Sequence, residues 1–170
     1  MTDAAEVRTD AAEVRMEIKG LMLDPNTNVP IVVLRDEGGE VLLPIWIGVF
    51  EANAIALRLE NVETPRPMTH DLLRSALEKL GAQIEKVVIS ELRDSTFYAR
   101  IHVQRNGDAI EIDARPSDAI ALALRSEAPI FVLAPVLEAA QAVNLATSDE
   151  EKLREWLEKV KPEDLGKYEM

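Results

Sequence analysis

The residues best suited to chemistry lie in one short stretch, DARPSDAIALAL over residues 113–124. This stretch closes an apolar, strand-like run and opens a helix that is apolar almost all round. Asp113, Arg115, Ser117 and Asp118 stand at the corner between them. Two carboxylates could hold a divalent cation such as Mg²⁺ or Mn²⁺, because hard cations take carboxylate oxygens. An arginine beside them suits the binding of a phosphate.

Other polar residues fall at predicted element ends and could complete such a site. A further carboxylate from Glu51 or Asp71 would give a site able to activate water against a phosphodiester. His70 is a candidate acid/base. Arg66, held between two prolines, is a stiffly mounted candidate for binding phosphate or carboxylate.

Each of these residues also has a structural explanation. Asp and Ser at helix starts are ordinary N-caps, and Arg115 can simply pair with a carboxylate. His70 fits a surface histidine near a cap, and Arg66 fits a structural salt bridge. Spacing alone leaves capping and catalysis open.

The elements that must position these residues follow an α+β pattern. Alternating apolar residues predict strands at 16–23, 29–35, 40–47, 83–91, 95–104, 108–113 and 130–133. Helical spacing predicts helices at 50–60, 70–80, 116–125 and 136–143, and a capping signature at 148–151 opens a further helix. Asn106-Gly107 is the strongest hairpin signal.

Two segments suggest an internal repeat. The sequences AIALRLE at 54–60 and AIALALR at 119–125 agree at five of seven positions, and each follows three predicted strands. We therefore predict a mixed sheet built from a duplicated β-β-β-α unit, with an extra helix between the halves and a C-terminal helix. In the first copy, Gly48 and Asn53 align with Asp113 and Asp118. The scaffold alone does not demand the second pair, which favours a functional role for them.

Composition limits the class of protein. The 170 residues carry a net charge of −12 and no cysteine, which excludes disulfide and thiol chemistry. No basic face is evident, so nucleic acid should be held weakly. No apolar run is long enough for a membrane helix, and we expect a cytoplasmic protein. Helices that are apolar on more than one face predict a homo-oligomer.

The chain is expected to form one domain with tails. Residues 1–15 contain TDAAEVR twice and are predicted to be a disordered or helical leader. The folded domain is expected at 16–145, followed by a C-terminal helix and tail at 146–170.

Three separated segments resemble the bifunctional nuclease domain family. They are IGVFEANAIAL at 47–57, PRPMTHDLLRSALEKLGA at 65–82 and DARPSDAIALALRSEAPIFV at 113–132. The resemblance covers roughly residues 16–140 and implies a nuclease that acts on DNA and RNA, in a mixed α/β fold that oligomerises. One departure is Asn61, where glycine is expected and where asparagine tolerates the same backbone.

The residues and the resemblance together predict a metal-dependent nuclease. The alternative is a non-enzymatic, oligomeric regulatory or ligand-binding module, in which the same residues would be caps and ion pairs. The predicted metal ligands are Asp113, Asp118 and Glu51, the predicted catalytic residues are Asp113, Asp118, His70 and Asp71, and the predicted substrate-binding residues are Arg66, Arg115 and Ser117.

Overall fold

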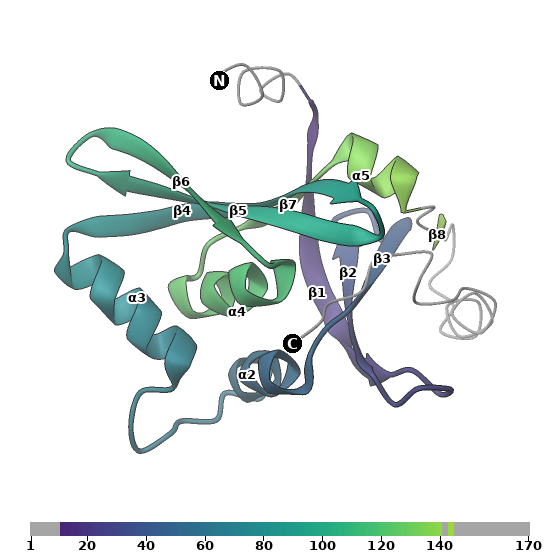
Figure 1. The fold of residues 1–170 in the computed structure, drawn as a ribbon, viewed down its shortest axis with the longest axis horizontal. Helices are drawn as coiled ribbons and strands as arrows, with labels where there is room; N and C mark the ends of the chain where they lie inside the picture. Colours follow the sequence, from purple (N-terminus) through teal and green to yellow (C-terminus); the bar gives the residue numbers. More distant parts are fainter. Residues whose placement is uncertain (1–10, 141–142, 145–170) are drawn as a thin grey trace.

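The seven predicted strands and a short eighth strand, β8, form one sheet in the order β6-β5-β4-β7-β1-β2-β3-β8 (Figure 1). Strand β8 was not predicted, because residue 143 was assigned to the helix expected at 136–143. The computed structural model describes residues 11–140 and 143–144. Neighbouring strands are antiparallel except for the parallel pair β4 and β7, so the sheet is mixed, and the α+β class is confirmed. The strands are β1 Glu13–Leu23, β2 Pro30–Asp36, β3 Val41–Trp46, β4 Ala82–Arg93, β5 Thr96–Arg105, β6 Asp108–Ala114, β7 Ile130–Leu133 and β8 Val143–Asn144.

The helices lie on both sides of this sheet. The helices α2 (Val49–Leu59), α3 (Thr69–Lys79) and α4 (Pro116–Ser126) lie on one side, and α5 (Ala134–Ala139) lies on the other (Figure 1). Three consecutive buried residues at 87–89 fit a strand, β4, that is covered on both faces. None of the helices in the described ranges is long and apolar enough to cross a membrane.

Helix α4 is the central helix of the site, and its burial has a cause within the chain. It packs against α2, α3, β4 and β5, so its apolar residues are covered on nearly every side. Its sequence therefore does not require a second subunit. Exposed apolar residues are found instead on α2 and α3, among other places, where Phe50 is 76% exposed and Leu72 62% exposed. The homo-oligomer stays a prediction.

Each half of the domain has a similar layout. The antiparallel strands β1, β2 and β3 precede α2, and the antiparallel strands β4, β5 and β6 precede α4, with α3 between the halves. The hairpin predicted at Asn106-Gly107 has the expected positive φ angles of 51° and 83°. Asn61 has a φ of 53° after α2, which is the backbone that asparagine tolerates. The duplication itself stays a prediction.

Some element boundaries differ from those expected from the sequence. Strand β1 begins at Glu13, inside the second TDAAEVR copy, because residues 13–16 pair with β7. Part of the predicted leader therefore belongs to the sheet, because it pairs with a strand that is distant in sequence. Helix α3 begins at Thr69, one residue before the predicted start, with Met68 at its N-cap. The rest of the leader at 1–10 and the predicted C-terminal helix lie outside the described residues.

Candidate active site

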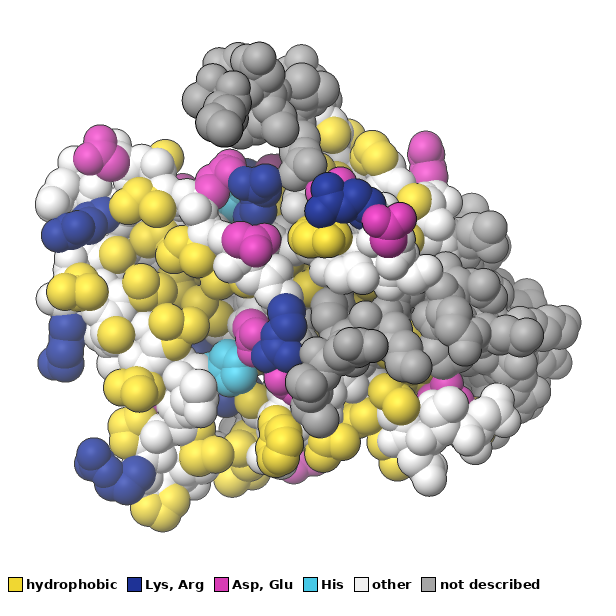
Figure 2. Space-filling model, in the orientation of Figure 1, with side chains coloured by type: hydrophobic (Ala, Val, Ile, Leu, Met, Phe, Trp, Pro, Cys, Tyr) yellow, Lys and Arg dark blue, Asp and Glu magenta, His cyan; other side chains and the backbone are white. Residues whose placement is uncertain are grey.

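A pocket of about 600 Å³ opens between α2, α3, the start of α4 and the strands β5 and β6. Its lining combines apolar side chains, including Leu73, Ile101 and Ile112, with a group of charged ones. Figure 2 shows a histidine beside acidic and basic side chains on this face, with hydrophobic side chains gathered next to them. A mostly apolar pocket with a few converging polar groups is the usual form of a ligand site.

The first charged pair in the pocket is His70 with Asp118. Their side chains come from α3 and α4, and His70 Nε2 lies 2.9 Å from Asp118 Oδ1. This hydrogen bond is the main reason that the pKa of Asp118 is lowered, and Arg115 lowers it further. The Asp118 carboxylate is therefore ionised and accepts the bond, so Nε2 carries the hydrogen. In the neutral imidazole the lone pair is then on Nδ1, which has no hydrogen-bond partner among the described residues.

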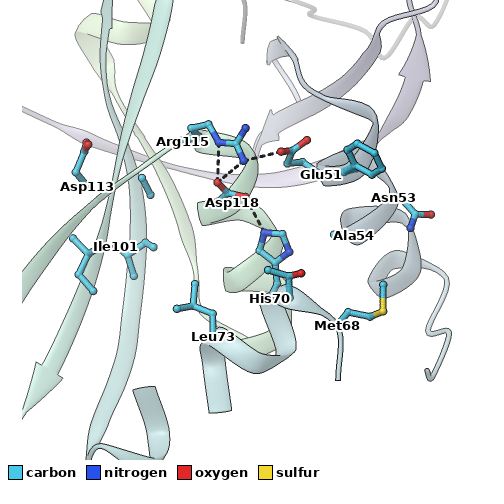
Figure 3. Close-up of a pocket in the computed structure, with 14 residues that line it drawn as sticks. Glu51, Asn53, Ala54, Met68, His70, Leu73, Ile101, Asp113, Arg115 and Asp118 are labelled. Carbon is cyan, nitrogen blue, oxygen red and sulfur yellow. Dashed lines mark hydrogen bonds and ion pairs between the residues drawn. The ribbon is translucent and has the colours of Figure 1, made fainter. Parts of the chain in front are cut away.

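Arg115 connects this pair to helix α2. It is the N-cap residue of α4, and its extended backbone (φ −70°, ψ 144°) precedes the first helical turn. Its Nε donates to Asp118 Oδ2 at 2.9 Å, and its Nη2 donates to Glu51 Oε1 at 2.6 Å (Figure 3). These carboxylates raise the pKa of Arg115 despite the opposing effect of partial burial. Within the described part of the chain, Nη1 has no partner and can donate to a ligand.

Glu51 ends the chain of contacts. It lies in the first turn of α2 and is 7% exposed. While Oε1 accepts from Arg115, its other oxygen, Oε2, is buried without a hydrogen-bond partner in the described structure. We call the linear set His70, Asp118, Arg115 and Glu51 the charged network. It joins α2, α3 and α4 at the pocket wall.

The predicted metal ligands do not converge. Asp113 lines the same pocket but is exposed on β6, apart from Asp118 and Glu51 (Figure 3). Those two carboxylates already share Arg115. Over residues 11–140 and 143–144, no group of three or more His, Asp or Glu side chains is arranged to hold a metal ion. As a set, Asp113, Asp118 and Glu51 do not fit a metal site.

Asp71 makes structural contacts and is not part of the charged network. Its Oδ2 accepts the backbone N–H of Met68 at 2.9 Å, and its Oδ1 accepts Arg125 Nε at 2.8 Å. Burial raises the pKa of Asp71, but these two hydrogen bonds outweigh burial and the pKa is lowered. The catalytic prediction for Asp71 is therefore not supported, and capping explains this residue.

Ser117 and Arg66 also lie away from the charged network. Ser117 is 1% exposed and its Oγ is buried without a partner in the described structure, so it cannot contact a substrate as predicted. Helical geometry turns position 117 toward the interior and Asp118 toward the pocket. Neither Ser117 nor Asp118 is the N-cap of α4. The N-cap residue is Arg115, and its side chain makes no capping bond. Arg66 lines a second pocket, described below.

Two arginines near the site were missed from the sequence. Arg125 is 4% exposed, and its Nη1 and Nη2 donate to the carbonyl oxygens of Ala121 and Ala54. Arg58 lines the second pocket together with Arg66. The available signal was a single basic residue near the end of each apolar helix. That signal does not distinguish a buried arginine that joins helices from one that is exposed to solvent.

The lowered pKa of Asp118 predicts a pH dependence of stability. A carboxyl whose folded-state pKa is below its ordinary value of 3.8 stabilises the fold fully above that value. The contribution is lost as pH falls through the folded-state pKa. We expect the stability difference between wild type and Asp118→Asn to be constant above about pH 5 and to shrink below about pH 4. Urea unfolding across pH 2.5–6 measures it, and a constant difference over that range would contradict it.

Comparison with known proteins establishes the family. The family model described as the bifunctional nuclease domain matches residues 32–144, a range that contains the whole charged network. The chain belongs to the bifunctional nuclease domain family. An uncharacterized protein of Mycobacterium tuberculosis is 42% identical over 160 residues, which cover 88% of this chain and 96% of that protein.

Plant members of the family are more distant. Bifunctional nuclease 1 of Oryza sativa subsp. japonica is 30% identical over 105 residues, covering 60% of this chain and 32% of that protein. Bifunctional nuclease 2 of the same plant is 32% identical over 107 residues, covering 61% of this chain and 33% of that protein. The similarity to named nucleases therefore concerns the domain, and about two thirds of each plant protein lies outside it.

Proposed function

We propose that this chain is a nuclease that hydrolyses phosphodiester bonds in DNA and RNA, with the charged network at its active site. Membership of the bifunctional nuclease domain family supports the reaction class. The observation that carries the proposal is the His70–Asp118 pair beside the unused Nη1 of Arg115 in one open pocket. Phosphodiester hydrolysis needs a proton acceptor and a donor that stabilises negative charge.

Each residue of the charged network would have a distinct task. Asp118 holds His70 in the tautomer with a free Nδ1 lone pair, which takes a proton from the attacking water as the new P–O bond forms. The bond to the leaving oxygen breaks, and that oxygen takes a proton from the imidazolium or from solvent. Arg115 Nη1 would donate to the phosphate as negative charge builds up. Glu51 is a positioning residue that fixes the guanidinium.

The metal requirement remains a separate proposal. Three carboxylates and one arginine line the pocket, so a substrate phosphate would add to an excess of negative charge. That balance supports a need for a cation in the complex. Because the predicted metal ligands do not converge on one point, every step above is carried by the chain's own side chains.

The test is cleavage of labelled single-stranded DNA and RNA by the purified chain. We expect cleavage by wild type and its loss in Asp118→Asn, prepared side by side, whereas Asp113→Asn keeps most of the activity. Loss in chelator and recovery with Mg²⁺ or Mn²⁺ would support the metal requirement, and full activity in chelator would contradict it. Equal cleavage by wild type and Asp118→Asn would attribute the activity to a contaminant and refute the assigned site.

A second candidate function is the non-enzymatic, oligomeric ligand-binding module. The exposed apolar side chains around the pocket favour it, since Phe50 is 76% exposed and Leu73 41% exposed. In that case the charged network would tie the helices together and the pocket would hold a ligand without reaction. Absence of cleavage, together with a stable oligomer by light scattering, would favour this function over the nuclease.

A further inference from the structure

A second pocket, of about 350 Å³, lies beside the first, where the end of α2 meets the loop at 62–68 and the start of α3. Met68 lines both pockets, so they are neighbours. The second pocket is lined by three arginines and two carboxylates, so the charge of its lining is positive. This differs from the first pocket and from the whole chain, whose net charge is −12. These charged lining residues are Arg58, Arg66, Arg125, Glu63 and Asp71.

The three arginines are not equivalent. Arg125 is buried and fully engaged with Asp71 and two backbone carbonyl oxygens. Each oxygen of Asp71 already accepts one hydrogen bond, and Arg58 lies near enough to help lower the pKa of Asp71 without forming an ion pair with it. The side chains of Arg58 and Arg66 are exposed, and neither guanidinium forms a hydrogen bond or ion pair within the part of the chain that the structure describes. Two guanidinium groups with unused donors therefore line the same pocket.

Their backbones are held in place. Arg66 lies between two prolines, whose rings fix φ, and its carbonyl oxygen accepts the Thr64 hydroxyl at 2.8 Å. Arg58 lies in the last turn of α2. Groups mounted on fixed backbone lose less freedom when they bind a ligand. Guanidinium groups match phosphate oxygens in geometry as well as in charge.

We propose that Arg58 and Arg66 form a phosphate-binding subsite for the substrate strand, outside the bond that is cleaved. The assignment to a strand rests on the proposed nuclease function. His70 and Asp71 are consecutive on α3, and each contacts a different residue of α4, so the start of α3 separates the two pockets. One phosphate would meet Arg115 and a neighbouring one would meet Arg58 and Arg66. The second subsite would give an acidic protein its attraction for a polyanion.

The test compares Arg58→Gln/Arg66→Gln with a matched control. Lys79→Gln/Arg105→Gln removes two exposed positive charges that line neither pocket. Both pairs are made in a His70→Gln background to prevent cleavage, and binding of a labelled oligonucleotide is measured by anisotropy over a range of salt. We expect the Arg58/Arg66 pair to lose at least about tenfold in affinity and its log–log salt slope to become less steep by about 0.7, from the one lost phosphate contact. A result equal to that of the control overturns the subsite.

Inorganic phosphate separates this proposal from the nuclease itself. We expect calorimetry to detect phosphate binding to wild type and to the control pair, and its loss in Arg58→Gln/Arg66→Gln. That result would support the site even if wild type cleaved no nucleic acid. Loss of phosphate binding with an unchanged oligonucleotide salt slope would assign the site to a free phosphate compound and overturn the strand assignment. No phosphate binding to wild type would overturn the site.

Discussion

Replacing Arg125 by methionine is expected to lower the free energy of unfolding by about 3 kcal/mol, because three hydrogen bonds of a buried charged side chain are lost. The Arg125 side chain is 3% exposed and joins three helices, through Asp71 on α3, the Ala54 carbonyl on α2 and the Ala121 carbonyl on its own helix α4. Methionine fills similar volume but supplies none of these donors. The cost comes from lost hydrogen bonds rather than from a cavity.

Urea unfolding followed by circular dichroism measures this effect. Arg74→Met is the matched control, because Arg74 forms an exposed i,i+4 pair with Glu78 that is worth about 0.3–0.5 kcal/mol. Arg125→Lys keeps the charge but not the fork of donors and should fall between wild type and methionine. If Arg125→Met were no less stable than Arg74→Met, Arg125 would not join the helices as its contacts indicate.

Most of the fold was predictable because most elements carry a local signal. Strand β5 alternates buried and half-buried residues as its sequence predicts, and the hairpin after it forms at Asn106-Gly107. The start of β1 was not predictable, because residues 13–15 become a strand only by pairing with β7, more than a hundred residues away in sequence. Local patterns carry no information on such distant pairing.

The sequence predicted four of the residues that meet in the candidate site, but not how their side chains contact one another. Glu51, His70, Arg115 and Asp118 were all candidates, because polar residues at element ends often meet in space. Asp113 and Asp118 seemed equivalent by spacing, yet the corner between strand and helix directs only Asp118 into the charged network. Side-chain direction at a corner depends on backbone angles that residue types do not determine. For the same reason the sequence could not distinguish the buried Ser117 from a surface cap.

The chemical role of the charged network is tested most directly at His70. His70→Gln is expected to lower kcat by about 10²–10⁴-fold, the usual contribution of a positioned acid/base. Glutamine can still donate a hydrogen bond to Asp118, so the contact between α3 and α4 can persist, but its amide has no basic lone pair. KM should change little, because the phosphate-binding donor of Arg115 is kept. Initial rates on labelled RNA, together with unfolding curves, measure both parts.

His102→Gln provides the control, because it removes the only other histidine of the chain. His102 lies on β5, outside the pocket, and burial lowers its pKa. A charged network that only holds the helices together predicts that each variant loses activity only in proportion to its own loss of stability. A catalytic network predicts a fall in kcat for His70→Gln alone, at a stability close to that of wild type. If His70→Gln lost activity only because it was much less stable than wild type, the acid/base role would be contradicted. The charged network would then serve only to hold the helices together.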